Sequence, residues 1–263
     1  MTIAYYNEID PYAAQWLRNL IDAGHIAPGV VDTRSIEDVT RNDLKGFTQV
    51  HMFAGIGGWS LALRNAGWSD NRHVWTGSCP CQPFSQTDKR AGVTDERHLW
   101  PSFYFLIEQC RPEVIFGEQV ASKDGLLWLD TVHADMERAG YAMGACDLCA
   151  AGFGSPQIRQ RLYWVGDSTG ESWQRSRESE EVIFSEGWEI QKRHSIPSNV
   201  APHIWSSWGS SEGADKRIRA IPTCYGSPVD GVPGIVGRLR SYGNAVVVPV
   251  AEAFISAYMG SVK

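Results

Sequence analysis

Long hydrophobic runs are missing from this sequence. No apolar stretch approaches the roughly 20 residues that a membrane-spanning helix needs. The first residues also lack the basic and apolar segments of a secretion signal. We therefore expect no membrane partner and predict a cytoplasmic protein.

A disulfide framework and a strong positive charge are missing too. Six cysteines lie scattered along the chain without a scaffold spacing, which favours a reducing compartment. A net charge of −6 argues against a protein that coats nucleic acid, although a local basic face is still allowed. Cys146 and Cys149 form a Cys-x-x-Cys pair, but a structural zinc site needs four ligands and no second pair has a suitable spacing. We expect no metal.

The chain has enough residues for one sizeable α/β domain and a small appendage. It contains 263 residues, of which 43% are hydrophobic and 21% charged. Strand patterns alternate with helical ones, which predicts a mostly parallel sheet with helices on both faces. The expected strands cover 3–9, 30–32, 49–53, 74–76, 114–116, 141–149 and 162–165, and the expected helices 12–23, 59–66, 103–109, 126–139 and 248–259. Residues 167–232 lose this periodicity, so we expect residues 1–166 and 233–263 to form the main domain.

Two short loops carry the residue types that chemistry needs. Residues 77–85 read Gly-Ser-Cys-Pro-Cys-Gln-Pro-Phe-Ser, and the prolines on each side of Cys81 stiffen the backbone around its thiol. Residues 53–58 read Phe-Ala-Gly-Ile-Gly-Gly between an expected strand and helix, where glycines let the backbone approach a ligand. Taken alone, the cysteines could be inert packing groups and the glycines a plain tight turn.

Pro-Cys-Gln-Pro-Phe-Ser resembles the nucleophile loop of the cytosine-5 DNA methyltransferases, and Phe-x-Gly-x-Gly-Gly resembles their S-adenosylmethionine loop. The resemblance extends over residues 3–166 and 241–258 in six blocks. It implies a Rossmann-like methyltransferase fold and transfer of a methyl group from S-adenosylmethionine to C5 of a flipped cytosine. It also implies double-stranded DNA as partner and a restriction–modification or phage-borne enzyme, which we expect to be a monomer in a bacterial or phage-infected cell.

The acidic cofactor blocks of the family are transposed in this chain. Only residues 59–76 separate the two loops, too few for the two strand–helix units expected there. Asn7-Glu8-Ile9-Asp10 resembles the first missing block and Asp32 the second, and both lie upstream of the glycine loop. Because a parallel sheet binds ligands at the carboxyl ends of its strands, whatever their order in the chain, we expect the usual spatial sheet to survive. Right-handed crossovers would then place the helix after Gly58 on the opposite sheet face from the family's arrangement.

The resemblance also assigns roles to individual residues. Glu8 would bind the ribose hydroxyls, Ile9 would pack on the adenine, and Asp32 would accept from the adenine amino group. Cys81 would attack C6 of the base, and Glu118, in a Glu-Gln-Val block where the family has Glu-Asn-Val, would bind its N3 and amino edge. Cys79 would be a packing group. The further expected cofactor contacts are Phe53, Ala54, Gly55, Ile56, Gly57, Gly58, Pro80, Asn244, Ala245 and Val246.

Basic residues supply the expected contacts to the base and to DNA. Arg159 and Arg161 lie at alternate positions, so in an extended segment they point the same way, one towards the base carbonyl and the other towards the catalytic loop or a phosphate. Residues 85–97 suit a mobile lid over the flipped base, and residues 167–232 occupy the family's target-recognition position. Acidic residues dilute the charge there, so a solvated surface insert is an alternative. The expected DNA contacts are Gln82, Ser85, Lys89, Arg90, Lys192, Arg193, Lys216, Arg217 and Arg219.

Three other functions stay open at the level of sequence. A related branch of the family methylates tRNA cytosines with the same loop. A noncatalytic DNA-binding relative would result if the transposition had ruined the cofactor pocket. A different one-carbon donor in an altered pocket is the third alternative.

Overall fold

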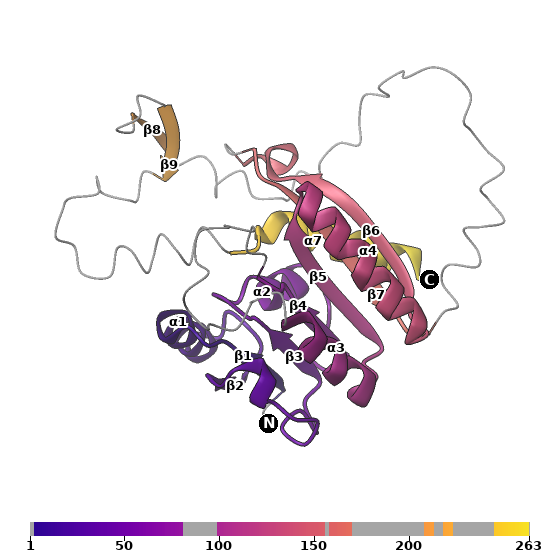
Figure 1. Ribbon diagram of the computed structural model, residues 1–263. Helices are drawn as coiled ribbons and strands as arrows, with labels where there is room; N and C mark the ends of the chain where they lie inside the picture. Colours follow the sequence, from indigo (N-terminus) through magenta and orange to yellow (C-terminus); the bar gives the residue numbers. More distant parts are fainter. Residues whose placement is uncertain are drawn as a thin grey trace, which may run out of the picture.

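The computed structural model describes residues 3–80, 99–155, 158–169, 208–212, 218–222 and 245–262. Seven strands form one sheet in the order β2-β1-β3-β4-β5-β7-β6 (Figure 1). In chain order the strands are β1 (Ala4–Asn7), β2 (Gly29–Asp32), β3 (Gln49–Met52), β4 (Val74–Gly77), β5 (Val114–Val120), β6 (Ala142–Cys149) and β7 (Gln160–Asp167). The first five are parallel to one another, whereas β7 runs antiparallel to both β5 and β6. The predicted mixed α/β sheet is therefore confirmed.

The helices divide between the two faces of this sheet. They are α1 (Pro11–Asp22), α2 (Gly58–Asn65), α3 (Leu99–Cys110), α4 (Lys123–Arg138) and α7 (Val248–Ser261), with short 3₁₀ turns η1 (Ile36–Asp38) and η3 (Ala150–Phe153). The core on one face joins η1, α3 and α4 to the side chains of Val50, Trp75 and Ile115. The cores on the other face join α1, α2 and α7 to those of Tyr6, Val74 and Phe116. Figure 1 views the sheet with α3 and α4 in front and α7 behind.

The expected spatial sheet survives the transposition. β1 lies between β2 and β3, parallel to both, with Tyr6 opposite Val31 on one side and His51 on the other. The strand that ends before Glu8, the strand that ends in Asp32 and the strand that leads into the glycine loop are therefore neighbours. Their carboxyl ends share one edge of the sheet.

The predicted position of α2 is wrong. From β1 to β2 the chain moves towards one edge of the sheet, and α1 covers one face. From β4 to β5 it moves towards the other edge, and α3 covers the opposite face. These two crossover units therefore have the same hand. From β3 to β4 it moves in the direction of the β4–β5 step, yet α2 lies on the face of α1. The β3–α2–β4 unit therefore has the opposite hand, the left-handed form that only about 2% of such crossovers adopt.

Buried polar contacts hold α2 on this face. Ser60 of α2 lies 3.0 Å from the Tyr6 hydroxyl, and its Oγ accepts a hydrogen bond from the Ala27 amide at 3.3 Å. The Tyr6 hydroxyl also donates to the Ala27 carbonyl at 2.7 Å. Because these groups are buried, moving α2 would leave several of them unsatisfied, at a cost of roughly 1–3 kcal/mol each. Specific side chains here outweigh the general preference for right-handed crossovers.

A second cluster of buried polar side chains lies beside the contacts of Tyr6 and Ser60, under α2. His51 Nδ1 is 2.8 Å from Thr76 Oγ1, its Nε2 is 3.3 Å from Gln49 Oε1, and its ring stacks on Tyr6. All of these side chains are buried. Burial lowers the pKa of His51 to about 3, so the imidazole is neutral at physiological pH.

The ends of the expected elements match their capping signals closely. Asp10 caps α1 by accepting hydrogen bonds from the amides of Tyr12 and Ala13, and Pro11 occupies the first helical position. Ser122 caps α4 through the Gly125 amide. The region in which the sequence shows no periodicity contains β8 (Trp208–Glu212) and β9 (Ile218–Pro222), which pair as an antiparallel hairpin. The proposed boundaries of a recognition region at 167 and 232 stay a prediction.

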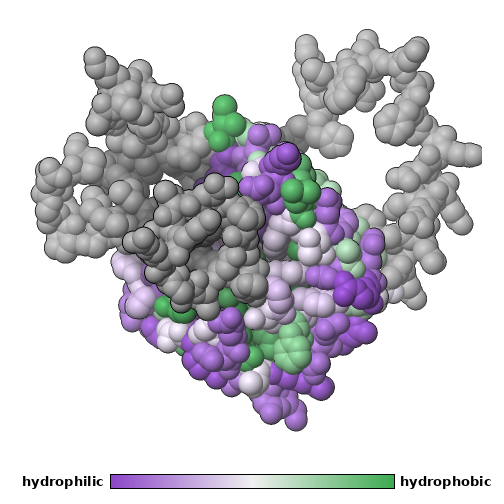
Figure 2. All heavy atoms as spheres, viewed as in Figure 1, coloured by the Kyte–Doolittle hydropathy of each residue, from purple (hydrophilic) through white to green (hydrophobic). Residues whose placement is uncertain are grey.

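The described surface is mostly polar. Figure 2 shows hydrophobic areas on the viewed face separated by hydrophilic residues. Among the described helices, none combines the length and apolar character needed to cross a bilayer.

Candidate active site

The glycine loop turns sharply between β3 and α2. Phe53 has a φ of 52° and Gly55 and Gly57 have φ of 55° and 83°, all in the left-handed region that glycine adopts without steric cost. A Cβ on Gly57 would also come within 3.3 Å of Leu17 and Ile26. Position 57 therefore favours glycine for both conformation and space, and α2 begins directly after it at Gly58.

Glu8 joins the transposed block directly to this loop. Its Oε2 accepts the Gly55 amide at 2.7 Å, and its Oε1 accepts the Asp10 amide at 2.8 Å. The Ala54 amide donates to the Asn7 carbonyl at 2.9 Å beside this contact. Ile9 follows Glu8 with 65% of its surface exposed.

Asp32 ends the neighbouring strand and has more partners than the sequence indicated. Its Oδ2 accepts the Tyr5 hydroxyl at 2.5 Å and the Arg34 guanidinium at 2.5 Å, while its Oδ1 accepts the Arg34 amide at 2.9 Å. These hydrogen bonds lower the pKa of Asp32 against the opposing effect of its partial burial. Arg34, which also lies 3.0 Å from Asp43, is a site residue that the sequence reasoning missed. Its position two residues after the strand-end acid was the available signal.

The C-terminal block lies next to the glycine loop. A Cβ on Gly58 would come within 3.2 Å of the Val246 carbonyl, so the two backbones are in close contact. The Arg159 guanidinium donates to the Ala245 carbonyl at 3.0 Å. Because Arg159 directly precedes β7, this hydrogen bond joins the C-terminal block to that strand. Asn244 lies outside the described residues.

Glu118 lies on β5 with 7% of its surface exposed. Arg161 Nε approaches Glu118 Oε1 at 2.8 Å as an ion pair, without the alignment of a good hydrogen bond. Desolvation by burial raises the pKa of Glu118, and the charges of Arg161 and Arg159 oppose that rise. A buried carboxyl group whose pKa is perturbed by burial and by two nearby cations is a common feature of active sites.

The two predicted arginines flank one face of this acid, and each has its own partner. Arg161 pairs with Glu118, whereas Arg159 holds the Ala245 carbonyl. Their alternate spacing therefore connects the acid of β5 on one side with the C-terminal block on the other. Ile158, directly before Arg159, has 86% of its surface exposed.

The segment that leads to Cys81 is fixed by Gln119. Its Nε2 donates to the Cys79 carbonyl at 3.3 Å and its Oε1 accepts the Val120 amide at 2.8 Å. The longer side chain that replaces the family's asparagine thus reaches the loop backbone. Cys79 is 5% exposed, and burial raises the pKa of its thiol, so it is a packing group as expected.

Several predicted residues lie outside the described residues. They are Cys81, Gln82, Ser85, Lys89, Arg90, Lys192, Arg193, Lys216 and Arg217. Pro80, the last described residue before them, directly follows the fixed Cys79. Arg219 lies on β9, opposite Ser211 of β8.

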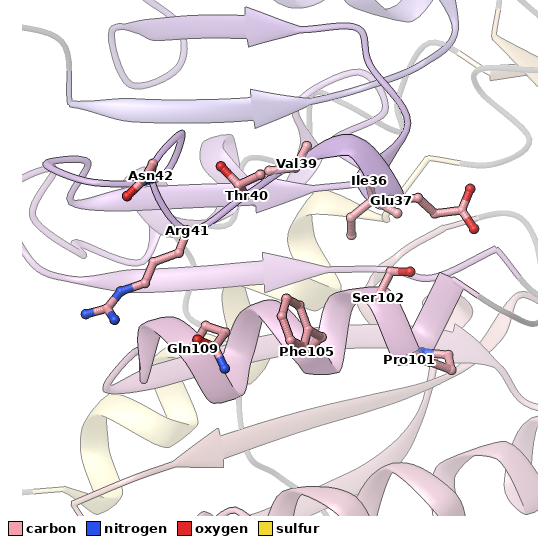
Figure 3. Close-up of a pocket in the computed structure, with 10 residues that line it drawn as sticks. All are labelled: Ile36, Glu37, Val39, Thr40, Arg41, Asn42, Pro101, Ser102, Phe105 and Gln109. Atoms are coloured by element: carbon pink, nitrogen blue, oxygen red, sulfur yellow. The ribbon is translucent and has the colours of Figure 1, made fainter.

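A separate groove of about 670 Å³ lies between residues 36–42 and α3. Figure 3 shows Arg41 and Gln109 near one end, and Glu37, Ser102 and Pro101 near the other. None of the predicted site residues lines this groove. Within the described part of the chain no three His, Cys, Asp or Glu side chains cluster as metal ligands. Cys146 and Cys149, three residues apart on β6, point to opposite faces of that strand.

Two curated proteins are similar to about half of this chain. The chain is 27% identical over 161 residues to the type II methyltransferase M.AplI of Arthrospira platensis, which is 46% of each protein. It is 26% identical over 170 residues to the type II methyltransferase M.HhaI of Haemophilus parahaemolyticus, covering 49% of this chain and 51% of the other. It therefore spans about half the length of these relatives.

A solved structure of a DNMT2 mutant from Spodoptera frugiperda matches 64% of this chain and 43% of its own, at 16% identity and a TM-score of 0.46. The family model described as C-5 cytosine-specific DNA methylase matches residues 69–212, more than half of the chain. This match begins just before β4 and includes the segment of Cys81, Glu118 and both arginines. The chain belongs to the C-5 cytosine-specific DNA methylase family.

Proposed function

We propose that the protein is a DNA cytosine-5 methyltransferase that uses S-adenosylmethionine in spite of its transposed cofactor blocks. The observation that carries this proposal is the 2.7 Å hydrogen bond from the Gly55 amide to Glu8. It joins an acid from the first strand of the chain to the glycine loop after the third. A chain whose cofactor pocket had been ruined by the transposition would have no reason to keep this contact.

The residues at this edge fit the cofactor by their chemistry. Glu8 would accept hydrogen bonds from the ribose hydroxyls, and the exposed Ile9 would pack on the adenine. Asp32 would accept from the adenine amino group once the exposed Arg34 guanidinium turns towards Asp43. The remaining contacts would come from Phe53, Ala54, Gly55, Ile56, Gly57, Gly58, Pro80, Asn244, Ala245 and Val246. When bound, the cofactor supplies an electrophilic methyl group on a sulfonium.

The base would be held between Cys81 and Glu118. Cytosine C5 is a weak nucleophile, so the Cys81 thiolate first forms a bond to C6 and moves electron density to C5. Glu118 would bind N3 and the exocyclic amino group, and Arg159 and Arg161 would polarise the ring and hold the catalytic loop. C5 would then take the methyl group from the cofactor, which would leave as an uncharged thioether. A base would then remove the C5 proton, and the C6–sulfur bond would break to release the Cys81 thiolate.

Double-stranded DNA is the proposed substrate. The reacting carbon lies inside the base stack, so the enzyme would have to flip the cytosine out of the duplex. Residues 85–97 would close over the flipped base, and residues 167–232 would contact the target sequence. Gln82, Ser85, Lys89, Arg90, Lys192, Arg193, Lys216, Arg217 and Arg219 would supply contacts to bases or phosphates. A restriction–modification or phage setting would suit such an enzyme.

The decisive experiment incubates the protein with S-adenosylmethionine carrying a labelled methyl group and either mixed duplex DNA or tRNA. We expect label in DNA, at C5 of cytosines in a defined short sequence. Label in tRNA alone would show that the substrate is RNA and not DNA. DNA binding without any cofactor binding in calorimetry would identify a noncatalytic relative. Cofactor binding with no transfer to either nucleic acid would contradict the proposed reaction.

A further inference from the structure

We propose that Trp59 and Ser78 are positioning residues that fix the direction of the Glu118 carboxyl group. The inference rests on the proposed function, because it concerns the acid that would bind the cytosine edge. Neither residue belongs to the blocks that carry the family resemblance as a contact to base or cofactor. Trp59 directly follows the glycine loop, and Ser78 directly follows β4.

The Trp59 indole is held rigidly beside the strand that carries Glu118. The ring is 4% exposed and stacks on Phe116 with centroids 6.1 Å apart. It also meets Tyr163 edge-on at 6.0 Å. Phe116 lies two residues before Glu118 on β5, and Tyr163 is the direct partner of Glu118 on β7. The ring therefore cannot turn without disturbing both neighbours of the acid.

The polar end of this ring orients the Ser78 hydroxyl. Trp59 Nε1 donates to Ser78 Oγ at 3.0 Å, and an indole N–H can only donate, so the serine oxygen must accept. The single hydroxyl hydrogen of Ser78 is then directed away from Trp59. Ser78 and Glu118 directly follow Gly77 and Gly117, which are paired in the register of β4 and β5, so the two residues are neighbours at this edge of the sheet. Burial raises the pKa of Glu118, and the nearby Ser78 hydroxyl opposes that rise.

Glu118 is thus held from two sides. Ser78 reaches it from the end of β4, and Arg161 Nε lies 2.8 Å from its Oε1 on β7. Trp59, Ser78, Glu118 and Arg161 thus form a series of neighbouring side chains. This series connects the first turn of α2 with the acid expected to bind the base. A carboxyl group with fixed neighbours on both adjacent strands is restricted in its orientation, which is the preorganisation that catalysis requires.

The test is a ¹³C NMR titration of the Glu118 carboxyl group in the full chain. Ser78→Ala removes the donor, so we expect the pKa of Glu118 to rise, because the lost hydrogen bond favoured the charged form. Trp59→Phe keeps an aromatic ring but removes the N–H that orients the Ser78 hydroxyl, and we expect a smaller rise in the pKa of Glu118. Ser78→Thr, which keeps a hydroxyl, should restore the wild-type value.

Trp68→Phe is the matched control. Trp68 shares the same core, but its Nε1 donates to the Arg72 carbonyl at 3.2 Å, so removing that N–H should not move the Glu118 titration. An unchanged titration in both Ser78→Ala and Trp59→Phe would overturn the proposal, as would an equal shift in Trp68→Phe. Thermal melting identifies any variant that fails to fold, and the remaining variants then decide.

Methyl transfer supplies the second readout. We expect kcat to fall about tenfold in Ser78→Ala and in Trp59→Phe, with little change in KM for the cofactor. Because the two side chains act through one hydrogen-bond chain, the double variant should lose no more than Ser78→Ala alone. If the wild-type protein transfers no methyl group, the proposed function fails, but the NMR titration still decides whether Trp59 and Ser78 position Glu118.

Discussion

The two halves of the carboxyl edge are held together in different ways. In the cofactor half, formed by the ends of β1, β2 and β3, the key contact joins the Glu8 side chain to a backbone amide of the glycine loop. In the base half, formed by the ends of β4, β5 and β7, side chains hold one another through Trp59, Ser78, Glu118 and Arg161. A contact to backbone depends only on where strand ends lie, so it tolerates a change in the order of strands along the chain. The side-chain network depends on particular residues, and it lies in the half that was not transposed.

Replacing the nucleophile should abolish methyl transfer, the reaction proposed for the base half. We expect Cys81→Ser to reduce methyl transfer below detection, because a serine hydroxyl is a far weaker nucleophile than a thiolate. Cofactor affinity, measured by calorimetry, should stay close to that of the wild type. Cys146→Ser, at an exposed cysteine of β6, serves as control. Substantial turnover by Cys81→Ser would refute the assignment of the nucleophile.

Replacing the carboxyl group of Glu118 should have the next largest effect. Glu118→Gln keeps the shape but cannot titrate, and we expect kcat to fall by roughly 10²–10⁴, the usual contribution of a positioned acid or base. Single-turnover kinetics with saturating cofactor would measure this loss. Glu108→Gln on α3 is the matched surface control. A Glu118→Gln enzyme with wild-type kcat would remove Glu118 from the mechanism.

Breaking the cofactor half should affect binding rather than chemistry. Glu8→Ala loses charged hydrogen bonds that are each worth about 1.5–3 kcal/mol, so we expect the Kd for S-adenosylmethionine to rise by roughly 10–100-fold. The affinity for DNA should not change. Glu137→Ala, at an exposed position of α4, is the control in calorimetry. Unchanged cofactor affinity in Glu8→Ala would count against the transposed site.

The polar interior under the cofactor half should make it sensitive to acid. The pKa of His51 is about 3 in the folded protein and near 6.5 when exposed. Between pH 6.5 and pH 3, His51 is therefore protonated in the unfolded chain but neutral in the folded protein. We expect this group to reduce the free energy of unfolding by about 1.4 kcal/mol per pH unit over that range. Urea titrations from pH 7 to 4.5 would measure the slope.

His51→Gln should flatten that slope, whereas replacing the exposed His73 in the same way should not. An equal slope in His51→Gln and the wild type would show that another group causes the acid sensitivity. The base half, whose interior on this face is lined mainly by aromatic and aliphatic side chains, has no buried histidine among the residues described around it.

Local signals in the sequence predicted most elements because local chemistry determines them. Asp10 and Pro11 mark the start of α1, and the apolar run at 114–116 marks a strand, although β5 continues to Val120. The adjacency of Glu8 and Gly55 followed from the rule that parallel strands share a carboxyl edge. The family model and the topology confirm the family and the fold class expected from the two loops.

The face occupied by α2 could not be predicted in this way. Handedness statistics favoured the wrong face, and the contacts that decide it join residues 27, 6 and 60, which are far apart in the sequence. The partners of Asp32 and the link from Trp59 to Ser78 were missed for the same reason. A tryptophan after a glycine loop and a serine after a strand are unremarkable until the fold brings them within hydrogen-bonding distance.

The early position of β1 and β2 has a consequence for synthesis on the ribosome. The β1–α1–β2 unit precedes β3 in the chain, so both of its strands are synthesised before the glycine loop. Glu8, which we propose to bind the ribose, is therefore already present when the glycine loop is translated. β3 then adds to the free side of β1, and β4 and β5 each add beside the strand before them, so the pocket can assemble in the order of translation instead of waiting for a late strand to insert.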